Sequence, residues 1–545
     1  MKLRKGNNQK KEYAAQIGVL GTDFSAEGPF TKNKRASYLV NYRYSTLGLL
    51  TNLKILDIGG TNTFQDLAFN LNFPTKKAGI FTVFGIGGLS KSGDILEKDT
   101  SLWETSEANY IGEFNSNMGV AGVTHQYFFN NSTYLKTIVA NTIQEINFYE
   151  DSVSAIDLKT NRTHTETFVN SNYRINTYIN SKLNNKNTIR TGIIGGLLQY
   201  DLNQQMLMAN QTWQTNLDKK GATTSFQSYA QWKHKFSEKL TLNTGVHFFR
   251  LSLTKANSLE PRLGLNYKLA ANQTLSAGFG IHSRMESISV YELSFPNKND
   301  VVKSWNNNLG FSKSNHYVLG YDIQLKKQKH IKVEAYYQSL YHLPIASDSS
   351  SSYALINQSG GFANEPLINK GTGYNVGTEV TFEKYLSNQS YYMLTASIFD
   401  SKFADINNQL YNTRYNANYR ITVLGGKEYA IGNAQKNLLE FNGKFIWSGG
   451  NRYTPIDLPA SIAGGRQVND NNQLFAEKVP DYWRFDVTVN YRVNNAKVAH
   501  VVSINIQNVS NRINLFGYQY NNKTKQIEEI DQFGLLPVLK YRIEF

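Results

Sequence analysis

The 545-residue sequence contains no cysteine. A disulfide scaffold, a cysteine-based zinc site and a thiol nucleophile are therefore excluded. The sequence also lacks any apolar run near the roughly 20 residues that a spanning helix needs. The most apolar short stretch, 192–198, is brief and rich in glycine. A membrane protein without such a helix must be a closed barrel, because lipid cannot satisfy exposed backbone groups.

Aliphatic residues are not concentrated as they would be for a soluble core, since the chain is 40% hydrophobic with a mean hydropathy of −0.44. What is abundant is aromatic: 34 Tyr, 30 Phe and 6 Trp make up 13% of the chain. These side chains are interleaved with Asn, Ser, Thr and Gly along the whole length. The composition favours a membrane barrel, whose lipid face needs only every second residue of a strand.

Basic residues exceed acidic ones, giving a net charge of +15. They are scattered, and no nucleic-acid module is present, so we expect no nucleic-acid partner. The excess of basic residues is better explained by a periplasmic rim and loops rich in Lys and Arg, which could contact lipopolysaccharide phosphates, than by nucleic-acid binding. The basic start, 2–5, has no apolar segment behind it and is not a secretory signal. We therefore expect either a signal that was removed or a piece of a longer precursor.

Strand periodicity is clear in several segments. In 36–46, Tyr38, Val40, Tyr42 and Tyr44 share one face, and polar residues dominate the other. The same alternation occurs in 484–493, where Phe485 to Val493 alternate with Arg484 to Arg492, and in 502–507. Such alternation predicts strands with one apolar and one polar face.

Tight polar links alternate with long ones along the sequence. Short links are expected at 130–133, 184–187, 237–239, 269–273, 327–330, 387–389 and 494–497. Long links are expected at 90–115, 145–164, 202–224, 285–312, 343–370, 450–480 and 511–531. The pattern predicts an all-β, transmembrane antiparallel β-barrel of about 22 strands, with short periplasmic turns, long extracellular loops and both termini periplasmic.

The last residues form a strand of their own. Leu539, Tyr541, Ile543 and Phe545 alternate with charged residues, and the chain stops on Phe545. An unpaired terminal strand would be an aggregation risk unless it closes against the first strand. We interpret this strand as the signal read by the β-barrel assembly machinery; the alternative is an ordinary amphipathic edge strand.

A barrel of about 22 strands needs a plug, because an open pore of that size would leak solutes. Strand periodicity begins near Lys11, and no segment after it resembles a globular plug. We therefore assign 1–10 to the end of a plug leading into the barrel and 11–545 to the outer-membrane barrel. The plug itself is expected before residue 1.

Several segments resemble the barrel region of TonB-dependent receptors, and their sequences are most similar to those of the Bacteroidetes branch. The segments are KLRKGNN (2–8), GVLG (18–21), EGPF (27–30), SYLVNYRYS (37–45), LEPRLG (259–264), HSR (282–284), NKGTG (369–373), GTE (377–379), GGNRYTP (449–455), DYWRFD (481–486) and QNVSNR (507–512). The plug and the TonB box of that family are missing from the sequence.

This resemblance implies TonB-dependent active uptake of a scarce or bulky nutrient through the outer membrane of a Gram-negative cell. A siderophore, a glycan, a peptide and a vitamin all remain open as substrates. The implied partners are outer-membrane lipid and lipopolysaccharide, the assembly machinery, and the TonB complex acting through the missing plug. Two alternatives stay open: a passive porin-like channel without a plug, and a structural or adhesive barrel.

No catalytic, metal or cofactor site is expected, and the chain is not predicted to be an enzyme. His164 and Glu166 would share a strand face, but two ligands are too few for zinc. The glycines of 85–88 lack the helix that a dinucleotide site requires. The adjacent His282 and Ser283 do not make a catalytic triad, since neighbours on a strand point to opposite faces.

The long loops are better candidates for ligand binding. We propose Phe362 in 343–370, and Arg452, Tyr453 and Arg466 in 450–480, as ligand contacts. Aromatic and arginine side chains carry much of the energy in binding sites. The alternative is an ordinary solvated loop.

Overall fold

The strands of the wall follow one another in chain order. This computed structural model describes residues 3–32, 34–48, 60–103, 109–208, 210–296, 302–358 and 365–545. The wall strands are β1 (Glu12–Gly18), β2 (Gly21–Pro29), β3 (Ser37–Tyr44), β4 (Gly60–Pro74), β5 (Ile80–Asp94), β6 (Tyr110–Phe128), β7 (Thr133–Val153), β8 (Thr160–Lys182), β9 (Asn187–Leu207), β10 (Trp213–Lys235), β11 (Leu240–Leu251), β12 (Asn257–Ala270), β13 (Gln273–Arg284), β16 (Ser312–Leu325), β17 (Lys329–Ala346), β18 (Leu367–Ser387), β19 (Ser390–Ala404), β21 (Tyr419–Ile431), β22 (Asn437–Ser448), β25 (Tyr482–Asn494), β26 (Ala499–Gln507) and β29 (Leu536–Glu544).

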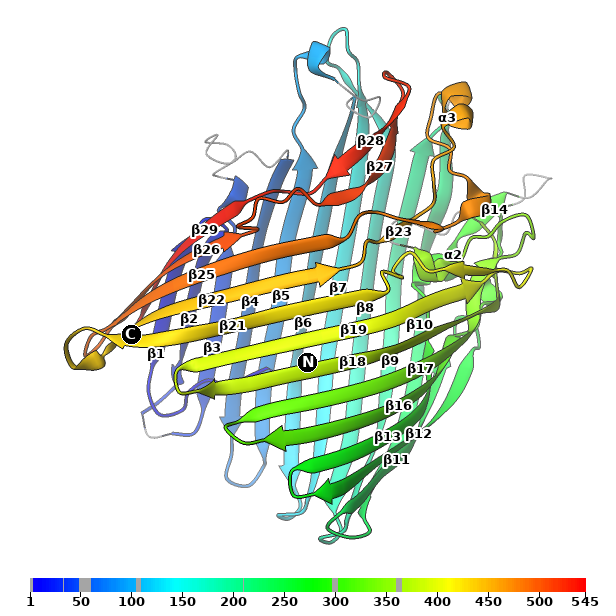
Figure 1. The fold of residues 1–545 in the computed structure, drawn as a ribbon. Helices are drawn as coiled ribbons and strands as arrows, with labels where there is room; N and C mark the ends of the chain where they lie inside the picture. The colour runs from blue at the N-terminus through cyan, green and yellow to red at the C-terminus, as the bar shows by residue number, and fades with distance from the viewer. Residues whose placement is uncertain are drawn as a thin grey trace.

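The sheet is closed. Each strand is antiparallel to the next, and β29 pairs both with β26 and with β1 (Figure 1). Within the described residues, the wall is a 22-strand antiparallel barrel, which confirms the predicted fold and strand number. Closure removes the free edges that would otherwise invite pairing with another chain.

Side chains alternate between the two faces of the wall as the sequence predicts. On β3, Tyr42 and Tyr44 are exposed on the outer face, whereas Asn41 and Arg43 bond to Asp23 and Asp66 of neighbouring strands. On β25, Phe485 and Tyr491 are exposed, and the alternating residues include the Arg484–Asp486 ion pair. The outer face is therefore apolar toward lipid, and the inner face is polar.

One rim of the barrel carries only short links, the longest being 30–36. Its aromatic side chains gather into pairs: Phe30 stacks on Phe73 at 5.2 Å, and Tyr127 meets Phe129 at 5.3 Å. Such rings are typical of the membrane interface of a barrel. Because β1 begins and β29 ends at this rim, both ends of the wall lie here.

The other rim carries all the long links. Its elements are η1 (Thr100–Leu102), α2 (Ile288–Glu292), β14 (Ser294–Pro296), β15 (Val302–Ser304), η2 (Asn306–Asn308), η3 (Leu355–Asn357), β20 (Leu410–Asn412), β23 (Arg452–Tyr453), α3 (Leu458–Gly464), η5 (Asn471–Gln473), β24 (Glu477–Lys478), β27 (Leu515–Asn521) and β28 (Gln526–Asp531). On the short-link rim lies η4 (Asn433–Gln435). Among the described residues, no helix is both long enough and apolar enough to cross a membrane.

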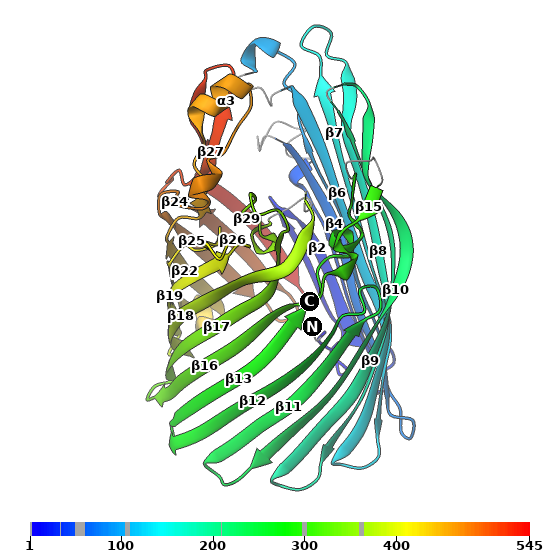
Figure 2. The same cartoon turned by 90° about the vertical axis from the view of Figure 1, so that its right-hand side faces the viewer.

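Two predicted loops are wrong. The segments 145–164 and 202–224 are mostly strand, because β7 and β8 turn only at 154–159, and β9 and β10 only at 208–212. These hairpins form a tall part of the wall (Figure 2), and Leu202 and Leu217 on their inner face are buried under mouth loops. In the sequence, polar residues such as Asn203 and Gln205 obscure the apolar alternation there. The backbone ladder continues nonetheless, so the wall is much taller at β6–β10 than at β25, β26 and β29.

The segment before β1 lies against the inner wall. Arg4 forms two hydrogen bonds with Glu27 of β2, at 2.6 and 2.7 Å, and its carbonyl accepts from Asn70 of β4 at 3.0 Å. A Cβ added at Gly6 would lie only 1.9 Å from the Tyr38 carbonyl oxygen, so glycine is needed for this close approach. Residues 3–11 therefore enter the barrel from inside its base.

Candidate functional site

Two long loops of the mouth pack inward onto the wall. The loop between β13 and β16 joins the loop between β17 and β18 in one apolar cluster against β8–β11. The cluster consists of Phe168, Tyr200, Leu202, Leu217, Phe249, Leu251, Ile288, Val290, Tyr291, Leu293, Leu309, Phe311, Leu355 and Leu367. Within it, Phe311 stacks on Phe249 with ring centroids 4.5 Å apart. This flank of the mouth is thus filled by a small hydrophobic core.

Hydrogen bonds hold the first of these loops at both ends. Tyr200 of β9 donates to Glu292 at 2.6 Å, while the Asn306 side-chain oxygen accepts from the Leu367 amide at 2.9 Å. Gly310 donates to Asn369 of β18 at 2.6 Å. The loop therefore bridges the wall from β9 to β18.

Tyr291, at the centre of the loop, has its hydroxyl against the Glu286 amide at 2.9 Å. Burial raises the pKa of the Tyr291 phenol well above its ordinary value, so the group stays neutral. A neutral phenol can accept this hydrogen bond without bringing a charge into the apolar cluster.

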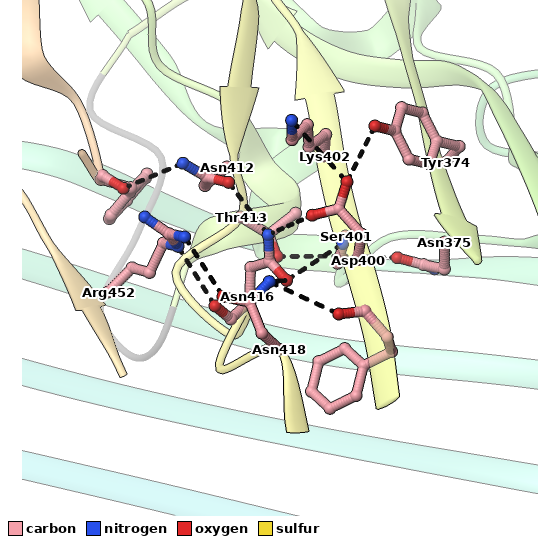
Figure 3. Close-up of polar contacts among 12 residues, drawn as sticks. Tyr374, Asn375, Asp400, Ser401, Lys402, Asn412, Thr413, Asn416, Asn418 and Arg452 are labelled. Carbon is pink, nitrogen blue, oxygen red and sulfur yellow. Dashed lines mark hydrogen bonds and ion pairs between the residues drawn. The ribbon is translucent and has the colours of Figure 1, made fainter. Parts of the chain in front are cut away.

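A polar network joins two other mouth loops (Figure 3). Asn416 is fully buried and donates to Asp400 of β19 at 2.7 Å and to Asn412 at 2.9 Å. Arg452 of β23 donates to the Asn416 carbonyl at 3.1 Å and to the Ala476 carbonyl at 2.8 Å. The Arg452 guanidinium thus connects the loop 405–418, through β23, to the residue that precedes β24.

The local sequence explains why this network forms. Asn418 adopts a left-handed backbone with φ of 69°, a conformation that asparagine tolerates better than most residues. The Asn418 side chain then donates to the Asn416 side-chain oxygen at 3.2 Å and accepts from Arg452 at 3.3 Å. These amide hydrogen bonds hold the loop together with an apolar contact, in which Tyr411 stacks on the buried Phe403 with ring centroids 5.6 Å apart.

The residues proposed as ligand contacts do not form one described site, although Arg452 and Tyr453 are neighbours in β23. Arg452 is held in the network just described, whereas the Tyr453 ring lies 5.0 Å from Tyr518 of β27. Arg466 is exposed just after α3, with no bonding partner among the described residues. Phe362 lies outside the described residues. Ligand contact by these four residues stays a prediction.

Arg466 is positioned by the caps of α3. The Asp457 side chain accepts from the Ala460 amide at 2.9 Å, and Gly465 ends the helix with φ of 62°. An aspartate N-cap and a left-handed glycine after the last turn are strong helix boundaries. They set the end of the helix at Gly465, and Arg466 follows directly as an exposed residue.

Sequence reasoning missed the residues that build the mouth. Asn306, Asn416 and Tyr291 gave no signal, because their roles depend on partners far away in the sequence. The asparagine-rich run 406–418 indicates turns. Nothing in it identifies Asp400 or Arg452 as partners.

The residues considered above as possible metal, catalytic or nucleotide sites make ordinary structural contacts. His164 and Glu166 do share a face, with Nε2 and Oε2 3.9 Å apart. Within the described ranges, no group of three or more His, Cys, Asp or Glu side chains could hold a metal ion. Ser283 donates to Glu260, while the His282 ring packs on His316 at 4.4 Å. The 85–88 glycines lie in β5, where Gly85 faces the Phe69 ring.

The C-terminal residues occupy the outer face where the barrel closes. Leu539, Tyr541 and Phe545 are exposed there, and Ile543 lies opposite Ala15 of β1 and His500 of β26. The strand pairs on both sides and so is no free edge. Its reading by the assembly machinery stays a prediction.

Comparison with known proteins gives one family and many similar folds. The family model described as "TonB dependent receptor-like, beta-barrel" matches residues 6–509. None of the curated proteins matches the chain.

Among solved structures, the siderophore receptor PiuA from Acinetobacter baumannii is 11% identical, with a TM-score of 0.68 over 99% of this chain and 82% of that one. The ferric-catecholate import receptor Fiu from E. coli K12 is 11% identical, with a TM-score of 0.69 over 99% and 82%. The pyoverdine receptor FpvA from Pseudomonas aeruginosa PAO1 is 12% identical, with a TM-score of 0.69 over 100% and 79%. At such low identity these three show a shared fold.

Proposed function

The chain belongs to the TonB-dependent receptor-like β-barrel family, and we propose that its loop-filled mouth captures a nutrient too scarce or too bulky for passive porins. The function of the chain is TonB-dependent uptake across the outer membrane. The observation that carries the proposal is the mouth itself: loops fold inward onto the wall and are held by buried hydrogen bonds. A pre-organised mouth of this kind suits capture better than free diffusion.

Uptake measurements test the proposal. A strain that lacks the gene would be compared with the complemented strain for uptake of labelled siderophores, glycans, peptides and vitamins. We expect one class to depend on the gene and on TonB equally. Uptake that persists without TonB would favour the passive channel, and binding without uptake would favour the adhesive barrel.

We further propose that a folded plug fills the lumen in the working receptor and carries the contact to TonB. A 22-strand wall encloses more space than its own side chains fill. The Arg4–Glu27 contacts support this proposal, because they hold the described residues 3–10 against the inner wall. The chain alone, reconstituted in planar bilayers, should conduct ions in large steps; a silent barrel would contradict the proposal.

We also propose that the short-link rim faces the periplasm, that lipopolysaccharide surrounds the wall, and that the chain is of the Bacteroidetes type and not an enzyme. The absence of cysteine makes the orientation easy to test. Ile156→Cys lies in a long-link-rim loop and is 98% exposed, whereas Glu238→Cys lies in the short turn 236–239. In intact cells, a membrane-impermeant maleimide should label only the first variant. Labelling of Glu238→Cys alone would reverse the orientation.

A further inference from the structure

The inner wall at β9–β13 contains a row of arginine, glutamine and glycine residues to which the uptake function assigns no role. The strand registers place Arg190, Gln231, Gly245, Arg262 and Gly280 opposite one another on five successive strands. Their neighbours Trp232, Val246 and Leu263 are exposed on the outer face. By alternation, the row faces the lumen.

Glycines create a hollow in this part of the wall. Arg262 has Gly245 and Gly280 as its cross-strand neighbours, and Gly264 and Gly278 follow one step below. A Cβ at Gly264, which lines the cavity, would meet no atom nearer than 3.8 Å, so the space there is not filled by a neighbouring side chain. The resulting cavity has a volume of about 620 Å³, which is in the size range of small-ligand sites.

The cavity is positively charged. Arg190, Lys233 and Arg262 line it, and among the described lining residues none is acidic. The carboxylate nearest to Arg262 is Glu260, at 2.8 Å, which also bonds to His247 at 3.0 Å and to Ser283. Glu260 is therefore shared among several donors and offsets only part of the charge.

Two of the cations have no carboxylate partner among the described residues. Arg190 is cradled by tyrosines, with its guanidinium 4.7 Å from the Tyr178 ring and 3.4 Å from the Tyr134 hydroxyl. Its Nε is buried and has no hydrogen-bond partner. Lys233 has no partner among the described residues. The exposed Lys233 ammonium can therefore meet an anion that enters the cavity, and the positive charge of Arg190 favours that anion at short range.

We propose that this cavity binds an oxyanion, either a carboxylate or a phosphate group, between Arg190, Lys233 and Arg262. The two-pronged guanidinium group matches the oxygens of a carboxylate or a phosphate, and neutral donors such as Asn180, Asn243 and Tyr229 complete the lining. Immediately above His247 on the same face of β11 lies Phe249 of the apolar cluster. The anion therefore sits directly beneath the loop-filled flank of the mouth.

Two sources could supply this chemistry: a free anionic solute crossing the lumen, or an acidic side chain of a segment that fills it. This inference rests on the proposed function in one respect only, namely that the cavity lies on the path of uptake. Binding is measured without uptake, so failure of the site and failure of the function are separable.

The test is calorimetric titration of the purified, detergent-folded chain with inorganic phosphate and with a tetraglutamate peptide. We expect Lys233→Gln, alone and with Arg190→Gln, to weaken binding of the preferred probe at least tenfold. Lys540→Gln, which removes a cation from the inner face of β29, is the matched control and should change binding less than twofold. Heat-modifiable gel mobility would verify that each variant is folded.

The two probes separate the sources. Tighter binding of phosphate assigns the site to a free solute, whereas tighter binding of the peptide assigns it to an acidic segment. If neither probe binds, or if Lys540→Gln weakens binding as much as Lys233→Gln does, the proposal is overturned. Should the double variant misfold, the single Lys233→Gln variant decides.

Discussion

Tyr13 and Phe545 exchange two backbone hydrogen bonds, of 2.8 and 2.9 Å, and their ring centroids lie 6.3 Å apart. The pair joins the first and last strands at the very end of the ladder. At this pair the sheet closes into a cylinder, so a substitution there affects the pairing of the first strand with the last.

Removal of Phe545 should therefore impair assembly. We expect deletion of this residue to lower the folded fraction in outer membranes several-fold, because both hydrogen bonds and the ring contact are lost. Heat-modifiable mobility on gels measures that fraction. Phe533→Ala, an aromatic change in an exposed loop, serves as control. Equal folding of the two variants would count against a role for the C-terminal residue.

Arg452 should act as a clamp between mouth loops. In Arg452→Ala, the Asn416 and Ala476 carbonyls lose a charged donor, which typically costs about 1.5–3 kcal/mol. We expect faster hydrogen exchange in both 405–418 and 449–481. Arg466→Ala should leave exchange unchanged. If Arg452→Ala weakens ligand binding while exchange stays the same, Arg452 is instead a direct contact.

Phe311 should anchor the inward loop. This side chain is only 2% exposed, and Phe311→Ala would remove the stack on Phe249 at a cost of about 3–5 kcal/mol. We expect protease cleavage within 285–311 of the folded barrel. Phe516→Ala, at a ring that is 68% exposed, should not alter the pattern. Resistance of Phe311→Ala to cleavage would show that the hydrogen bonds to β18 suffice.

The loop 347–366 should pack more tightly in mild acid. Burial, with the Asp348 carboxylate nearby, raises the pKa of Glu365 above its usual range. The folded loop then binds the proton more tightly than the unfolded chain does. Its stability is greatest below the unfolded pKa and declines as pH rises through the folded one.

Hydrogen exchange at 351–353, corrected for intrinsic rates, should accordingly be slower at about pH 5 than at about pH 8. Glu365→Gln should remove most of this difference, because a neutral amide keeps the Ser351 contact without the charge. An unchanged pH dependence in Glu365→Gln would assign the effect to another group.

The wall could be predicted from sequence because its physics is local. Tyr42 and Arg43 reveal the two faces of β3 through simple alternation, and the same holds for Phe485 and Arg484 on β25. The prediction failed at 145–164 because polar and charged residues such as Glu150, Asp151 and Arg162 interrupt the apolar alternation in the sequence. Apolar alternation disappears there while backbone pairing continues.

The mouth could not be predicted in the same way. Asn306 is buried because it meets Leu367, and Arg452 is held because it meets Asn416, which are relationships between distant segments. Residue type alone identified Arg452 and Tyr453 as candidate ligand contacts. It could not separate a ligand contact from a support for the loops.

The unequal height of the wall has a mechanical consequence. Where β8 and β10 each run for 23 residues, the mouth is a continuous ladder, and opening it locally means breaking many cooperative hydrogen bonds. Opposite, β26 and β29 have nine residues each, and the mouth there consists of separate pieces such as α3 and the β27–β28 hairpin. Slow local opening of the mouth should therefore be confined to the side of β26 and β29, while the side of β8 and β10 stays in place.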